Sequence, residues 1–98
     1  MSAHAIVGLC TIELYLPGIT SLKEKRGIIK SMLKRIHNQF NVATAEIDFL
    51  DKWQRSVIAI TAVSNATPHV HQVLNTVIRF IEDQYPDAMI VDQDIEIL

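Results

Sequence analysis

Cationic side chains between residues 21 and 40 are the clearest chemical feature of the sequence. Six of the nine Lys and Arg residues lie in this stretch. Four of them recur at spacings of three and four residues, which places them on one face of an α-helix: Lys23, Arg26, Lys30 and Lys34. Contact with nucleic-acid phosphates requires several cations on one face and no reading of base sequence. The same row could equally be a solvated surface that keeps a small domain soluble, and both interpretations stay open.

A second distinctive group is Trp53 with Arg55, next to a short connection between two predicted strands. Tryptophan and arginine are enriched at interaction hot spots, so this pair can extend a surface that binds RNA. The alternative is that Trp53 covers one end of the hydrophobic core.

Residues that could perform catalysis are sparse. His69 and His71 are two positions apart on a predicted helix, so they point about 200° apart and cannot chelate one metal ion. The sequence contains no nucleophile–base pair, Gly-rich phosphate loop or cysteine pair. Cys10 lies in an apolar strand and is predicted to be a small buried side chain. We therefore predict a non-enzymatic protein with no catalytic residue, no cofactor and no metal site.

The cations belong to an amphipathic helix that begins after Ser21. Ser21 and Glu24 form a capping box, in which Ser21 accepts from the third helical N–H and Glu24 reaches back to the N–H of Ser21. An apolar seam follows on the other face: Leu22, Ile29, Met32, Leu33, Ile36 and Phe40. Lys25 and Arg35 flank this seam, and their stems are expected to cover it while their charged heads stay in water. Gly27 costs about 1 kcal/mol relative to alanine in a helix interior.

Alternating and helical patterns predict a β-α-β-β-α-β order. The predicted strands span residues 6–16, 42–49, 54–64 and 88–98, and the second helix runs from Thr67 until Tyr85-Pro86 breaks it. Right-handed crossovers on a single sheet give a ferredoxin-like α+β fold, with two helices on one face of a four-stranded antiparallel sheet. The first and third strands are expected to be central, and the other sheet face is expected to be open.

This open face should carry six of the eleven acidic residues: Glu13, Glu46, Asp48, Asp92, Asp94 and Glu96. Where an RRM stacks bases on aromatic side chains of its two central strands, the outward positions here carry Leu9, Thr11, Ala59 and Thr61, beside carboxylates that repel phosphate. Apolar residues on the same face are scattered surface residues or a patch for a second copy of the chain: Val7, Leu9, Val57 and Val63. The sheet could thus support a homodimer or a small-molecule regulatory site.

Composition bounds the remaining possibilities. The 98 residues suffice for a single domain, 1–98, in which residues 1–4 are expected to form a loose N-terminal end. The net charge of −2 alone favours no nucleic acid. No apolar run approaches the roughly 20 residues of a membrane span, and no signal peptide is evident. We expect a cytoplasmic protein with no membrane partner.

Several segments resemble the YlxP-like family of bacterial proteins, a domain of unknown function. They are Ser21-Leu22-Lys23-Glu24-Lys25-Arg26, Phe40-Asn41-Val42, Ala45-Glu46-Ile47-Asp48, Asp51 through Trp53-Gln54-Arg55, and Val63-Ser64-Asn65. The resemblance implies a ferredoxin-like fold and no established activity. Members are often encoded beside transcription-elongation and ribosome-maturation factors, which favours an RNA or ribosome partner. The leading hypothesis is an accessory factor that contacts RNA or the ribosome through the first helix. The alternative is a self-associating or small-molecule regulatory module of the open sheet.

Overall fold

Strands and helices alternate along the chain as the patterns predict. A computed structural model describes residues 4–98, so the predicted loose end lies outside the described residues apart from His4. The elements are β1 (Ile6–Tyr15), α1 (Leu22–Gln39), β2 (Ala43–Asp48), β3 (Arg55–Ser64), α2 (Thr67–Gln84) and β4 (Met89–Ile97). Their order confirms the predicted β-α-β-β-α-β arrangement.

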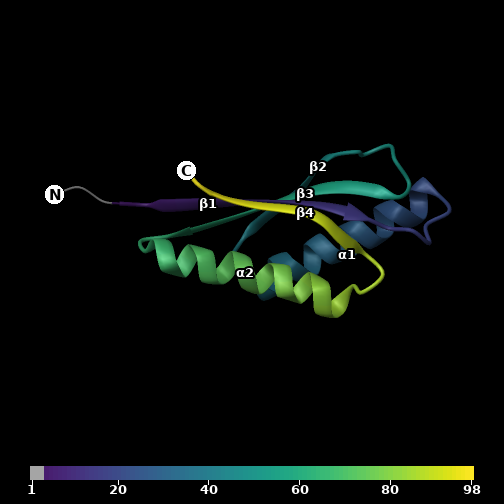
Figure 1. Cartoon of the computed structure of the whole chain (residues 1–98). Helices are drawn as coiled ribbons and strands as arrows, with labels where there is room; N and C mark the ends of the chain where they lie inside the picture. The colour runs from purple at the N-terminus through teal and green to yellow at the C-terminus, as the bar shows by residue number, and fades with distance from the viewer. Residues whose placement is uncertain (1–3) are drawn as a thin grey trace.

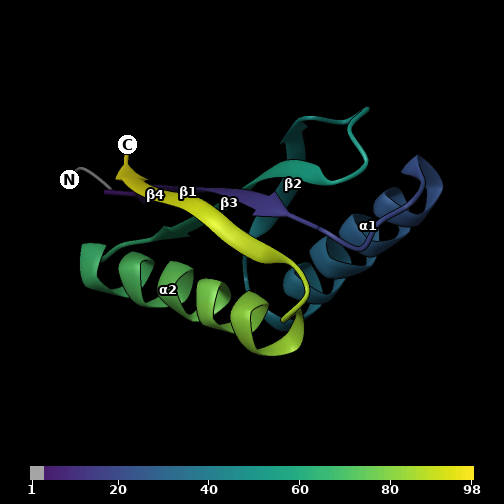
Figure 2. The ribbon, with the colours of Figure 1, turned by 45° about the vertical axis from the view of Figure 1, so that its right-hand side comes forward.

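All neighbouring strands are antiparallel, and the sheet has the order β2-β3-β1-β4. Figure 1 shows both helices on the same side of this sheet. α2 packs against β1, β3 and β4, whereas α1 lies mainly against the edge strand β2 (Figure 2). This arrangement confirms the ferredoxin-like α+β fold. Within residues 4–98, no helix is both long and apolar enough to cross a membrane.

The core lies between the sheet and the two helices. Its fully buried side chains come from alternate strand positions and one face of each helix: Cys10, Ile12, Leu14, Ile58, Ile60, Met32, Ile36, Leu74 and Val77. The predicted burial of Cys10 is confirmed, and this burial, together with the nearby Asp94 carboxylate, raises the pKa of its thiol to about 11. Gly8 allows α2 to pack closely on β1, because a Cβ there would clash with Val70 Cγ1.

The start of α1 follows the predicted capping box with one difference. Ser21 is the N-cap, and its Oγ accepts from the Glu24 N–H at 3.1 Å. The Glu24 carboxylate reaches back one residue further than predicted, accepting from the N–H and hydroxyl of Thr20 at 3.3 and 3.2 Å. This cap holds the first turn of α1, from which the cationic row continues.

The two edge strands depart from simple alternation. In β2, Thr44 and Glu46 lie opposite the buried Ile60 and Ile58, so they face the helices. The sequence pattern predicted the reverse, with Glu46 on the open face, and this prediction is wrong. The register shifts between Glu46 and Asp48, which returns Asp48 to the open face and leaves Ile47 52% exposed.

A similar irregularity in the β1–β4 pairing leaves Val91 of β4 exposed. The open face therefore carries five of the six predicted carboxylates, which lie opposite outward residues of the central strands: Glu13, Asp48, Asp92, Asp94 and Glu96.

Candidate functional site

The cationic row of α1 is exposed along the whole helix. Its members are Lys23, Arg26, Lys30 and Lys34, all solvent-exposed. The ion pairs among residues 4–98 are Lys25–Glu46 and Arg55–Glu13, so no member of the row is neutralised by a carboxylate. Four cations on an exposed helix, with no carboxylate partner within the described part of the chain, attract an anionic ligand, and this attraction weakens at higher salt because of screening.

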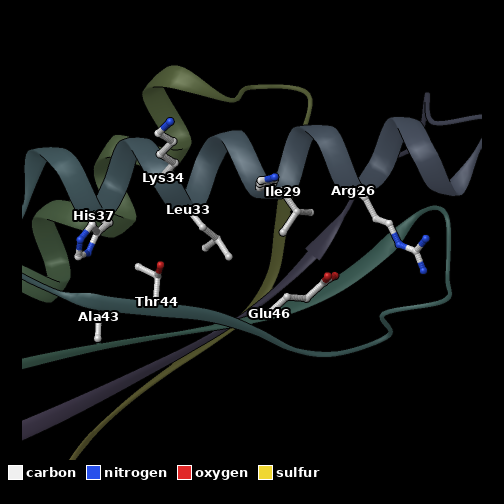
Figure 3. Close-up of a pocket in the computed structure, with 9 residues that line it drawn as sticks. Arg26, Ile29, Leu33, Lys34, His37, Ala43, Thr44 and Glu46 are labelled. Carbon is white, nitrogen blue, oxygen red and sulfur yellow. The ribbon is translucent and has the colours of Figure 1, made fainter.

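Three members of the row line a groove between α1 and β2 of about 630 Å³. The α1 side contributes Arg26, Ile29, Lys30, Leu33, Lys34 and His37, and the β2 side contributes Ala43, Thr44 and Glu46. In Figure 3, Ile29, Leu33 and Thr44 point between the helix and the strand, and Lys34 points away from the strand. The groove thus combines an apolar floor with a cationic rim.

His37 contributes an imidazole ring to the groove lining, at the end formed by the C-terminal part of α1. Its Nδ1 lies 3.0 Å from the carbonyl oxygen of Val42, and because a carbonyl can only accept, Nδ1 carries the proton. The interaction fixes the ring beside β2 and leaves Nε2 available to a bound molecule.

The prediction that the charged head of Lys25 stays in water is wrong. The lysine side chain is fully buried, and Nζ donates to Glu46 Oε2 at 2.5 Å and to the carbonyl oxygen of Phe49 at 2.8 Å. Ser56 Oγ donates to the same Glu46 oxygen at 2.7 Å. Glu46 is thereby paired within the fold, so the one carboxylate of the groove lining does not offset the cationic rim. The pair also ties α1 to the β2–β3 hairpin.

Phe49, at the turn of this hairpin, has a left-handed backbone with φ of 57°, unusual for a bulky residue. Three contacts hold it there. Its carbonyl accepts from Lys25, its N–H donates to Asp48 Oδ1 at 2.7 Å, and its ring lies 4.2 Å from the Arg55 guanidinium carbon. The structure around the turn supports a conformation that costs on the order of 1–3 kcal/mol.

Trp53 and Arg55 do not join the groove. Trp53 is 52% exposed at the hairpin, so the ring does not simply close the core. Arg55 pairs with Glu13 at 2.6 Å, and Glu13 lies opposite Val57 on the open face. Arg55 is thus engaged on the far side of the sheet from α1, and Trp53 is the member of this pair that stays available at the hairpin.

The predicted self-association residues share the open sheet face but are spread along it. Val7 pairs with Val63 at one end of the central strands, Leu9 follows on β1, and Val57 lies toward the other end. Leu9 also lines a shallow hollow of about 150 Å³ with small residues of β2 and β3. Val63 is exposed, whereas the other three are half-buried.

The sequence analysis missed the groove residues Thr44, Leu33 and His37 as site residues. His37 follows Lys34 by three positions, so helical spacing places it on the same side of the helix as the cationic row, a signal that was readable in the sequence. Thr44 had no such signal, because its face depends on the pairing register of β2.

Comparisons with known proteins match nearly the whole chain. The sequence model of a family described as "Protein of unknown function (DUF503)" matches residues 7–95. A curated relative from Bacillus subtilis (strain 168), "Uncharacterized protein YlxP", is 38% identical over 82 residues, which cover 84% of this chain and 88% of the relative. Neither description assigns an activity, a ligand or a partner.

Proposed function

This chain belongs to the DUF503 family, and we propose that it is a non-enzymatic accessory protein that contacts RNA, free or within the ribosome, through α1. The observation that carries the proposal is the row Lys23, Arg26, Lys30 and Lys34, which is exposed and has no carboxylate partner among the described residues. A net charge of −2 would oppose binding if the charges were mixed. Here five carboxylates lie on the open sheet face, across the sheet from α1.

The mode of binding follows from the residue types. Lysine and arginine bind phosphate by charge and hydrogen bonds, and each contact releases counterions from the RNA. Four such contacts give a slope of log affinity against log salt concentration of roughly −3 for single-stranded RNA. The RRM mode on the sheet face is unsuited, because outward positions of the central strands carry Thr11, Ala59 and Thr61 in place of aromatic rings.

The test is binding of a hairpin RNA, with a duplex stem and an unpaired loop, measured by fluorescence anisotropy at about 50 and about 200 mM salt. The Lys30→Glu, Lys34→Glu double variant should bind about tenfold or more weakly, with a salt slope reduced by roughly half. The control is a triple variant on the exposed side of α2, Gln72→Glu, Asn75→Glu and Arg79→Glu, which changes the net charge equally.

Wild-type affinity and slope in the α1 variant would remove the proposal, as would equal losses in both variants. The second outcome would mean that net charge alone governs binding.

A second candidate function is self-association through the open sheet face. The observation that favours it is that, within residues 4–98, both helices cover the opposite face, so neither helix lies over Val7, Leu9, Val57 and Val63. A dimer built there would leave the α1 groove exposed, so the two candidates are compatible.

A further inference from the structure

The outer edge of β2 borders the groove. β2 is the last strand of the sheet order, and β3 is its one neighbour within the described sheet. Alternate residues of an edge strand direct their N–H and C=O groups away from the sheet, where they need water or a ligand as partner. Ala43 and Thr44 both line the groove; Thr44 faces α1, whereas the Ala43 side chain points away from the helix (Figure 3). The groove therefore offers backbone donors and acceptors along one wall.

The other two sides of the groove have different chemistry. Its floor includes Ile29, which is buried, and Leu33, which is half-buried. Its rim carries Arg26, Lys30 and Lys34, spaced four residues apart, so each charge lies about 6 Å further along the helix axis than the last. Apolar surface, edge-strand groups and regularly spaced cations thus run side by side.

A single-stranded nucleotide chain matches these three features together. Its unstacked bases have flat apolar faces and hydrogen-bonding edges, and its phosphates repeat along one backbone. A duplex hides base faces in the stack and presents mainly phosphates outward, so it could use the rim and leave the floor and the edge strand unoccupied. Glu46 does not oppose a phosphate backbone, because the buried Lys25 ammonium pairs with it.

We propose that the groove between α1 and β2 is a binding site for single-stranded RNA, with phosphates along Arg26, Lys30 and Lys34 and bases against the floor and the β2 edge. The inference rests on the proposed function and names its ligand class. An extended peptide could also pair with the β2 edge. The cationic rim favours RNA, because backbone pairing to a peptide does not require a row of cations.

The experiment compares one short RNA sequence as a single strand and as a duplex, by anisotropy with wild type and two variants. Thr44→Glu places a carboxylate in the groove, and Ala45→Glu places the same charge on the adjacent residue of β2, which lies opposite Ala59 on the other face. Thermal midpoints check that both variants fold. Wild type should bind the single strand at least about tenfold tighter than the duplex. Thr44→Glu should weaken single-strand binding about tenfold, and Ala45→Glu by less than about threefold.

Each alternative outcome has a distinct meaning. Equal affinity for both RNA forms, or equal effects of the two variants, overturns the groove assignment while the cationic face stands. Absence of binding to either RNA overturns the proposed function and the groove assignment together. A synthetic peptide of alternating Glu and Val is the third probe. Peptide binding that Thr44→Glu abolishes, with RNA binding unaffected by this variant, would assign the groove to strand addition instead.

Discussion

Lys25 occupies a position in the helix that the apolar seam itself defines. Leu22, Lys25 and Ile29 are separated by three and four residues, so the lysine stands in line with the seam. A lysine is buried there because Glu46 supplies the opposite charge and Phe49 a carbonyl acceptor, while Ser56 donates to the same Glu46 oxygen. Because lysine is charged, the Lys25 ammonium was expected in water. Its spacing from Leu22 and Ile29 instead places it on the buried face of the helix, and the position on the helix decides the burial.

Replacing Lys25 should therefore destabilise the fold more than replacing an exposed lysine. Lys25→Met leaves Glu46, whose side chain is 16% exposed, without a cation, and we expect a loss of about 3 kcal/mol in the free energy of unfolding. Chemical denaturation measures it. The control Lys23→Met should change stability by less than about 0.5 kcal/mol, because that side chain is exposed and has no carboxylate partner among residues 4–98.

Adding Glu46→Gln to Lys25→Met removes the uncompensated charge and should recover much of the loss. Equal denaturation midpoints for the two single lysine variants would show that the buried pair contributes nothing to stability.

At the scale of elements, two glycines have opposite roles. Gly8 allows α2 to approach β1, since a Cβ there would meet Val70 Cγ1 at 2.3 Å and Leu74 Cδ1 at 3.0 Å. Gly27 lies inside α1, and a Cβ there would meet nothing within 4 Å. The packing of α2 on β1 therefore requires a glycine, whereas no contact within the described chain requires one in α1.

Gly27→Ala should stabilise the protein by about 0.5–1 kcal/mol, because alanine lowers the entropy lost when a helix interior forms. Gly8→Ala is the matched comparison and should destabilise by roughly 1–3 kcal/mol through overpacking against Val70. Thermal unfolding followed by circular dichroism gives both signs in one experiment. A destabilising Gly27→Ala would mean that the exposed face of α1 has a structural need for glycine that its surroundings do not explain.

For the whole molecule, the fold separates charge between two layers. The α1 side carries the exposed cationic row, and the open sheet face carries Asp48, Asp92, Asp94 and Glu96, together with Glu13, which pairs with Arg55. The separation matters over roughly 8–10 Å at ordinary salt, the distance over which exposed charges act. An anionic partner is thus directed to one side of the molecule.

Self-association is tested on the other side of the molecule. If the open face forms a homodimer, Leu9→Asp should give a monomer, because a buried charge beside Glu96 would be uncompensated in the interface. Light scattering over a range of concentrations measures the molar mass, and Gln72→Asp on exposed α2 serves as control and should remain dimeric. Monomeric wild type together with monomeric Leu9→Asp would exclude the homodimer.

Most of the fold could be predicted from local patterns, and the candidate site could be predicted in part. The cationic row follows from helical spacing alone, and its four members are exposed as a group beside the apolar seam. The groove beside it could not be predicted, since its second wall belongs to β2. Ala43, Ala45 and Ile47 resemble a core face, yet the pairing with β3 turns Thr44 and Glu46 toward the helices.

By itself, the sequence determined the order of elements, the face of α1 that carries charge and the burial of Cys10, because periodicity and side-chain hydrophobicity act locally. Only the tertiary structure decided that Lys25 is buried, that Glu46 pairs with it and that Arg55 lies on the far side of the sheet. The face on which Glu46 lies depends on the register of β2, which the extra residue at Ile47 shifts. The burial of Lys25 and the engagement of Arg55 depend on charge pairs between residues distant in the chain.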